Sequence, residues 1–328
     1  MKKRLSLSGF KSDTGAALVT VLLLVSVMAI GAVVTFEALG YSIKRSSAQR
    51  QFDQAGFYAL GGEQLAVVAA EGFFSSGAQL HEPRPVSFEI EGGRIDGLIA
   101  DTSNCFNINS LVERRDIGAY AVRASAAQHY RRLLLAIGFN ERQSEQLTAT
   151  LIDWIDSDSK PMPSGAEDYD YGALDRPYRT ANTLVADVSE LYLVRGYDNS
   201  VMPVLKPFIC TFGTTAPAVM NINTVTVDQA PLLVALVGGN FKLESAVELI
   251  LSRPGKGYDN LSDFWLEPIL TARDVDQSIR KQTSIKSRYF LSKIRVKHFD
   301  ATTHLTSFIQ VDEAGVGRLV LHQRGVFP

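Results

Sequence analysis

An uncharged apolar run near the N-terminus constrains this chain more than any other feature. The run extends from residue 16 to residue 36, Glu37 is the first charge after it, and four basic residues precede it, namely Lys2, Lys3, Arg4 and Lys11. About 20 apolar residues suffice for one helix to cross a bilayer. Basic residues before such a helix hold its N-terminal end in the cytoplasm. We therefore expect one membrane-spanning helix, with everything after residue 37 outside the cytoplasm.

Three interpretations of this segment compete. A secretory signal peptide has a shorter apolar core and a small-x-small cleavage site after it, for which Ala29 and Gly31 offer only a poor match. An uncleaved signal anchor is the second interpretation. In the third, a prepilin-type signal, cleavage follows a glycine directly before the apolar run. The position of Gly15, between the basic leader and a full-length apolar helix, favours the third.

The helix is expected to continue beyond the membrane. No proline occurs between the run and Pro83, and small or apolar residues recur at spacings of three and four. They form one stripe: Phe52, Ala55, Ala59, Gly62, Ala66 and Ala69. Small side chains in such a stripe let another element approach closely. The pattern predicts one helix over about 16–71, stopped within the stretch from Gly72 to Gly77.

Strand-like segments occur at both ends of the region after this helix. Alternation around Gly92 and Gly93 predicts a β-hairpin from 86–91 and 94–100. Three further strands are expected near the C-terminus, over 288–296, 303–311 and 318–323. The pattern between the two groups is helical. The expected fold class is α+β, with the N-terminal helix packed on one antiparallel sheet and a large all-α domain inserted into that sheet.

Composition excludes some functions. With 328 residues, 46% of them hydrophobic, the chain is long enough for about two compact units. A net charge of -2 provides no electrostatic footprint for nucleic acid. The two cysteines, Cys105 and Cys210, are far apart in the sequence. In an exported protein we expect them to form a disulfide, the alternative being two separate buried thiols.

The insert contains a weak internal repeat of a short helix, a glycine-bearing turn and a second helix. Its copies span 131–155 and 231–253, and segments of one kind trail them at 184–192 and 261–265. Helix-hairpin-helix modules of this form can bind DNA phosphates through backbone amides at the turn. No basic patch flanks the second copy, so we expect a structural helical module and no nucleic-acid partner.

The stretch from Asp153 to Asp175 has the most concentrated set of candidate metal-binding or catalytic side chains in the chain. It contains seven acidic residues, and Lys160 is its only base. Asp153 and Asp156 lie one helical turn apart. A loop forced by Pro161, Pro163 and Gly165 follows them; it can bring three acidic residues back over Asp156 and Asp158, namely Glu167, Asp168 and Asp170.

Carboxylates packed together repel one another, and a hard divalent cation removes that repulsion. Oxygen ligands in an irregular loop suit Ca²⁺ better than Zn²⁺, which prefers His or Cys. A solvated acidic loop without a cation is the alternative, and a hydrolase with paired carboxylates is a third possibility. The five histidines are scattered and no catalytic motif is present, so we expect no enzyme.

These features together resemble one family, the K-type minor pseudopilins of bacterial type II secretion systems (the general secretion pathway protein K family). The resemblance covers nearly the whole chain, and the acidic block is its most specific part. The matching segments are Gly15-Ala-Ala-Leu-Val-Thr-Val-Leu-Leu-Leu, Cys105-Phe-Asn-Ile-Asn-Ser-Leu, Asp153-Trp-Ile-Asp-Ser-Asp, Gly165-Ala-Glu-Asp-Tyr, Pro177-Tyr-Arg-Thr-Ala-Asn, Ser189-Glu-Leu and Asn221-Ile-Asn-Thr.

The resemblance implies cleavage after Gly15 by the prepilin peptidase and methylation of the new N-terminus at Ala16, although most relatives begin with Phe or Met there. The fifth mature residue is Thr20, where most pseudopilins carry Glu. A buried Glu at that position neutralises the N-terminal ammonium of a neighbouring subunit, and an unpaired buried charge is costly. A subunit without this Glu fits the end of the fibre.

The family also implies domains, partners and a cofactor. The expected divisions are a leader (1–15), a transmembrane helix (16–36), a pilin-like domain in two parts (37–104 and 286–328) and a helical insert (105–285). The partners implied are I-type and J-type minor pseudopilins in a tip complex, with an H-type subunit below. Calcium is implied on Asp156, Asp158, Glu167, Asp168 and Asp170. The alternatives are a signal-anchored periplasmic hydrolase and a minor pilin of a type IV pilus.

Overall fold

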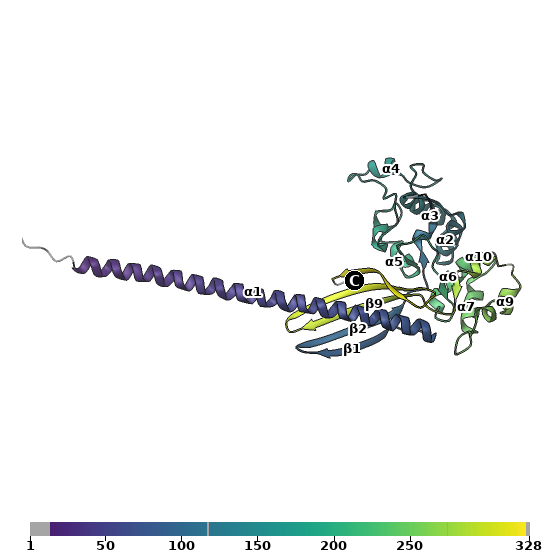
Figure 1. The fold of residues 1–328 in the computed structure, drawn as a ribbon. Helices are drawn as coiled ribbons and strands as arrows, with labels where there is room; N and C mark the ends of the chain where they lie inside the picture. The colour runs from purple at the N-terminus through teal and green to yellow at the C-terminus, as the bar shows by residue number, and fades with distance from the viewer. Residues whose placement is uncertain (1–13, 117, 274, 326–328) are drawn as a thin grey trace, which may run out of the picture.

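The computed structural model describes residues 14–116, 118–273 and 275–325. One long helix, α1 (Thr14–Ser76), carries a five-stranded sheet on its C-terminal half, and a mainly helical domain extends beyond the sheet (Figure 1). The predicted leader lies outside the described residues except for its last two. The predicted combination of a long helix, an antiparallel sheet and a helical insert is confirmed.

Helix α1 is continuous from the apolar run into the sheet, as its lack of proline predicts. It ends at Ser76, inside the predicted stop. Gly77 follows with a left-handed backbone (φ 66°), and its N–H donates to the carbonyl of Phe74 while that of Ala78 donates to Phe73. These bonds satisfy carbonyls that a helix end leaves without partners. The helix therefore has a defined C-terminal cap at the far end of the sheet.

The first half of α1 contacts no other part of the described chain. All described side chains from residue 17 to residue 39 are exposed, and most of them are apolar. Among the described residues, α1 is the one helix long and apolar enough to cross a membrane. An exposed apolar surface of this extent belongs in lipid. This half of the helix fits a single-pass membrane anchor.

The sheet combines strands from before and after the insert, all antiparallel. Its spatial order is β1-β2-β9-β10-β11. Every strand predicted from the sequence is present, and the bounds are β1 (Arg84–Ile90), β2 (Gly93–Asp101), β9 (Tyr289–His298), β10 (Ala301–Val311) and β11 (Gly317–Arg324). Strand β2 pairs with β9 from Gly93↔His298 to Asp101↔Phe290. The insert therefore leaves and re-enters the fold at adjacent strands.

Small residues on α1 let the sheet pack close to the helix. Ala55 and Ala59 are buried against Ile95 and Val296, and Ala70 is buried against a second apolar cluster on β9 and β10. Phe52 belongs to the predicted stripe but is 50% exposed, so the helix–sheet contact begins one turn later. The stripe therefore forms the contact surface between α1 and the sheet.

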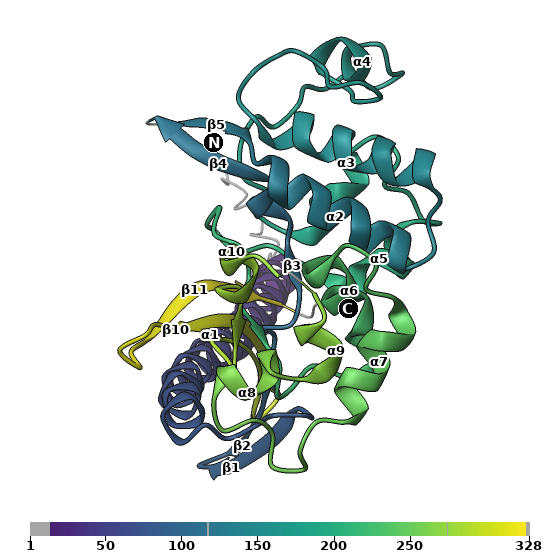
Figure 2. The same cartoon turned by 90° about the vertical axis from the view of Figure 1, so that its right-hand side faces the viewer.

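The insert is mainly helical and contains both predicted helical hairpins. Helices α2 (Ala124–Ala136) and α3 (Glu141–Ile155) form the first, and α6 (Ala230–Val237) and α7 (Leu243–Leu251) form the second (Figure 2). The other helices are short: α4 (Asp168–Gly172), α5 (Met202–Leu205), α8 (Leu261–Trp265), α9 (Pro268–Thr271) and α10 (Gln277–Arg280).

Three two-stranded ladders in the insert were not predicted from the sequence. They pair β3 (Phe106–Asn107) with β6 (Ile209–Cys210), β4 (Val112–Asp116) with β5 (Ala119–Val122), and β7 (Met220–Asn221) with β8 (Thr283–Ser284). Four of these six strands have only two residues, and a strand of that length leaves no periodic signal. The expected disulfide is present, and Cys105–Cys210 joins the β3–β6 ladder with a Cα–Cα distance of 5.8 Å.

The glycine turn of the second hairpin is used for packing. Gly238 and Gly239 both have left-handed backbones (φ 68° and 60°). A Cβ atom at Gly238 would lie 1.9 Å from Nη1 of Arg132, which comes from α2 of the first hairpin. The side of this turn that carries Gly238 is thus covered by protein. This supports a structural role for the repeat.

We expect a leucine at position 62 to force α1 away from the sheet. A Cβ atom at Gly62 would already lie 3.3 Å from Cγ2 of Ile294. Gly62→Leu should therefore lower the free energy of unfolding by about 1–3 kcal/mol. At Gly61 no atom lies within 4 Å, so Gly61→Leu should be neutral or stabilising by up to ~1 kcal/mol. Thermal unfolding in detergent, followed by circular dichroism, measures the stability of both variants. Equal shifts in melting temperature would contradict the close packing of α1 on the sheet at Gly62.

Candidate metal centre

Helix α3 delivers two carboxylates to one place. Its N-terminus has a capping box in which Asn140 and Gln143 bind each other's backbone N–H groups, and its apolar face is buried in the insert's core. Asp153 lies in the last turn. Asp156 is the C-cap, where the backbone becomes extended (ψ 171°) and the chain leaves the helix. The predicted one-turn separation of Asp153 and Asp156 is therefore present at the end of a buried helix.

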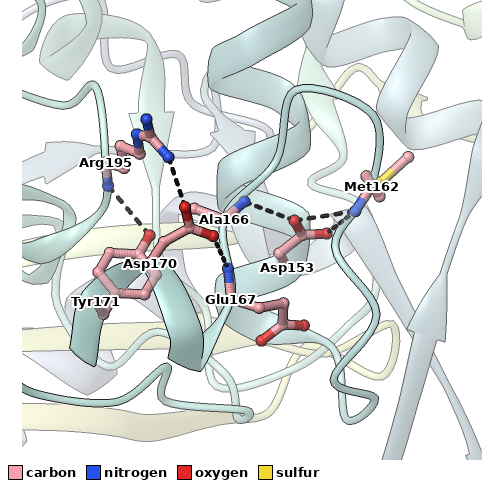
Figure 3. Close-up of polar contacts among 7 residues, drawn as sticks. All are labelled: Asp153, Met162, Ala166, Glu167, Asp170, Tyr171 and Arg195. Carbon is pink, nitrogen blue, oxygen red and sulfur yellow. Dashed lines mark hydrogen bonds and ion pairs between the residues drawn. The ribbon is translucent and has the colours of Figure 1, made fainter. Parts of the chain in front are cut away.

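Asp153 organises the loop that follows. It is fully buried, both of its oxygens lie 3.1 Å from the backbone N of Met162, and Oδ2 accepts the N–H of Ala166 at 2.8 Å (Figure 3). Burial raises the pKa of this carboxyl to about 6 even though the backbone N–H groups lower it. Gly165 completes the turn, since a Cβ atom there would lie 1.8 Å from Oδ2 of Asp153.

The loop brings one distant carboxylate back to the helix end. Asp156, Asp158 and Glu167 each offer an oxygen, and these oxygens all lie within 4.8 Å of one another. Asp156 and Glu167 are 3% and 4% exposed, whereas Asp158 is exposed. Three of the five predicted ligands are therefore brought together, two of them buried.

The buried oxygens of this cluster are incompletely satisfied. Asp156 Oδ1 and Glu167 Oε1 have no hydrogen-bond partner among the described residues. Burial, followed by the charges of Asp158, Asp153 and Glu167, raises the pKa of Asp156 to about 7. Burial and the charge of Asp153 also raise the pKa of Glu167. Three such carboxylates cannot all ionise cheaply unless a cation lies between them.

The other two predicted ligands have different partners. Oδ1 of Asp168 accepts the backbone N–H of Thr180 at 3.0 Å and its hydroxyl at 2.8 Å. Asp170 accepts the backbone N–H of Glu167 at 3.2 Å and pairs with Arg195 at 3.0 Å (Figure 3). Both residues therefore support the loop that carries Glu167.

The donor set fits a hard cation. Every candidate ligand atom in the cluster is a carboxylate oxygen, and it is held on an irregular loop, as Ca²⁺ sites are. Burial of Asp156 and Glu167 makes them unsuitable as the catalytic pair of a hydrolase, because a substrate must reach both groups.

The sequence analysis did not identify Asp153 as the residue that organises the loop. The available signal was an aspartate in the last turn of a helix, followed by Pro-x-Pro-x-Gly.

Comparison with known proteins extends these observations. Two models of the family described as type II secretion system protein K match residues 104–214 and 220–286. The type II secretion system protein K of Pectobacterium carotovorum subsp. carotovorum is 33% identical, over 90% of this chain and 92% of its own length. That of Klebsiella pneumoniae is 32% identical with the same coverage.

A solved structure is similar over most of the fold. It is a chain in the crystal structure of the GspK-GspI-GspJ complex from the type 2 secretion system of enterotoxigenic Escherichia coli. The match has a TM-score of 0.70 and 27% sequence identity, and it covers 86% of this chain and all of that one. Coverage of this extent must include most of the insert, which makes up more than half of the chain.

We predict that Gly165→Ala opens the loop around Asp153. The new methyl group cannot coexist with the carboxylate in its present position, so the backbone bonds from Met162 and Ala166 must lengthen. The expected loss is roughly 2–4 kcal/mol of unfolding free energy. Gly172→Ala, at the end of α4 with no atom within 4 Å, is the matched control and should change little. Chemical denaturation compares them, and equal stabilities would refute this role of Asp153.

Proposed function

Because this chain belongs to the type II secretion system protein K family, we propose that it acts as the minor pseudopilin at the tip of the pseudopilus. The observation that carries the proposal is the near full-length match to a chain of the GspK-GspI-GspJ complex. A long apolar helix packed on a sheet is the form of a subunit that joins a helical fibre. The proposed role is structural and involves no catalysis.

The proposed partners are I-type and J-type minor pseudopilins, with an H-type subunit below them. The apolar half of α1 has no partner within the described chain, and packing against the corresponding helices of other subunits would cover it. The insert, by contrast, is a bulky addition at one end of the sheet (Figure 1). Such bulk would clash inside a tightly wound fibre and has room only at its end.

Thr20 supports the same position in the fibre. Its hydroxyl donates to the carbonyl of Ala17 within α1 at 2.9 Å and provides no charge. A subunit of this kind cannot neutralise the N-terminal ammonium of a neighbour, so it is excluded from interior positions. Before assembly we propose an inner-membrane protein with a cytoplasmic N-terminus, cleaved after Gly15 by the prepilin peptidase and methylated at Ala16.

We further propose that the carboxylate cluster binds calcium through Asp156, Asp158 and Glu167. Support comes from the two buried oxygens without partners and from the purely oxygen donor set. Asp168 and Asp170 are proposed to support the site or to complete it on binding. A bound cation would remove the repulsion among the buried carboxylates and stabilise the distal part of the insert.

The proposed tip role predicts a specific defect in export. Deletion of the gene should abolish secretion while the major pseudopilin remains stable, and the intact chain should restore secretion. Gly15→Leu leaves the apolar helix in place but blocks cleavage, so this variant should not restore secretion. Mass spectrometry should find Ala16 as the N-terminus of the protein without the substitution, and not of the Gly15→Leu variant. Normal export in the deletion strain would contradict the role.

The proposed calcium site predicts opposite effects of one substitution. Asp156→Asn removes a buried charge, so in EDTA at pH 7 it should raise the melting temperature and increase the free energy of unfolding by about 1–2 kcal/mol. It should also abolish the stabilisation by calcium, which for the unchanged chain is about 2.7 kcal/mol at a hundredfold excess over Kd. Scanning calorimetry with and without CaCl2 measures both effects.

Asp175→Asn is the control for this experiment, because Asp175 is an exposed acidic residue of the same segment that lies outside the cluster. It should retain the full response to calcium. A calcium response that survives Asp156→Asn would contradict the proposed ligand set. Absence of a calcium response from the unchanged chain would mean that the cluster binds no calcium.

A further inference from the structure

A second feature of the insert lies beside the carboxylate cluster and is lined by none of the cluster's three residues. An open hollow of about 660 Å³ separates α4 from the segment 192–199. Nine large hydrophobic side chains are exposed in the described part of the insert, and four of them line this hollow: Tyr169, Leu174, Tyr192 and Leu193. Tyr169 is 89% exposed. Such clustering of tyrosine and leucine at one concave place is typical of a binding surface.

Contacts within the insert hold part of the wall of the hollow in place. Tyr171 packs edge-on against Trp154 at 5.3 Å, and the hydroxyl of Tyr178 donates to the carbonyl of Leu193 at 2.8 Å. The Arg195 N–H donates to the hydroxyl of Tyr171 at 3.2 Å, as Figure 3 shows. A ligand would therefore not have to order this part of the surface, which favours binding.

The charge of this region selects the kind of ligand. Three charged residues line the hollow, namely Asp170, Arg195 and Asp198, so its lining has an excess of negative charge. In the hollow, Arg195 is paired with Asp170. Among the described residues, Asp198 accepts hydrogen bonds only from backbone and hydroxyl groups of its own turn. Tyrosine ring faces attract cations as well. A ligand with basic groups next to apolar ones complements this surface.

We propose that this hollow, the tyrosine groove (Tyr169, Tyr178, Tyr192 and Leu193), binds an extended basic and apolar segment of another polypeptide. Lysine or arginine side chains of that segment would lie over the tyrosine rings near Asp198, and its apolar side chains would pack on Leu193. Helix α4 lies at the end of the insert farthest from α1 in both views, so packing of α1 in a fibre leaves the groove free (Figures 1 and 2).

The inference rests on the proposed function only in placing the groove at the outer end of the fibre. Binding itself can be tested with the purified full-length chain in detergent. The probe is a fluorescent 12-residue peptide of alternating arginine and leucine, with a counterpart that has glutamate for arginine. Fluorescence anisotropy should give a micromolar Kd for the basic peptide and no binding of the acidic one.

Variants separate groove binding from general attraction to an acidic surface. Tyr169→Ala combined with Tyr192→Ala should weaken binding at least tenfold, and Asp198→Asn should weaken it severalfold. Leu251→Ala removes an apolar side chain on α7 that is 71% exposed and lies outside the groove, and it should leave Kd unchanged. An unchanged melting temperature and calcium response show that each variant is folded; if the double variant is not, Tyr169→Ala alone serves, because that side chain is almost fully exposed.

Two outcomes would overturn the proposal. Equal binding by the unchanged chain and the tyrosine variants would mean that charge alone attracts the peptide. Binding of a neutral oligosaccharide such as chitotriose in place of the peptide would mean that the tyrosines stack on sugar rings. Neither outcome depends on secretion, so failure of this proposal and failure of the tip role are distinguishable.

Discussion

The pairing of β2 with β9 is the interaction on which the rest of the structure depends. It joins residues 93–101 to residues 290–298 in continuous register and so closes a loop that contains the entire insert. Closing a long loop costs conformational entropy that grows slowly with its length. That cost is offset where the paired strands bury Ile95, Ile99 and Ile294 beneath α1. The sheet and the helix therefore form as one unit, and neither is complete without the other.

Hydrogen bonds at the place where the insert joins the sheet extend this pairing. Oδ2 of Asp101, the last residue of β2, accepts the hydroxyls of Thr224 and Ser287, both at 2.5 Å. The hydroxyl of Ser103 accepts the N–H of Arg288 and lies near the carbonyl of Tyr289. Because these bonds are buried or half-buried, they define the direction in which the insert leaves the sheet. The disulfide and the two helical hairpins follow this junction in the chain.

The carboxylates of the insert have distinct physical roles. Asp153 is buried but satisfied by backbone N–H groups, and its role is to shape a loop. Asp156 and Glu167 are buried with oxygens that lack partners, and this arrangement is suited to a cation. Asp170 both caps Glu167 and pairs with Arg195, so it links the candidate metal centre to the wall of the tyrosine groove. A fixed position of Asp170 therefore stabilises both the loop of the candidate metal centre and the wall of the tyrosine groove.

The sequence by itself determined the features that depend on local periodicity. The apolar run, the absence of proline up to Pro83 and the small-residue stripe predict one helix with a membrane half and a packed half. Alternation predicts every strand of the sheet. The sequence also indicates that acidic residues can converge here, because the prolines and the glycine after Asp156 force a loop that can turn back towards the helix.

Only the tertiary structure decided which carboxylates meet. Asp168 and Asp170 are near Glu167 in the sequence but have Thr180 and Arg195 as partners, and those partners come from segments that no local pattern connects to the loop. The short ladders such as β3–β6 and the tyrosine groove arise in the same way, from residues far apart in the chain. Periodicity reports which face of an element is buried, whereas the partner of a side chain depends on how the elements pack together.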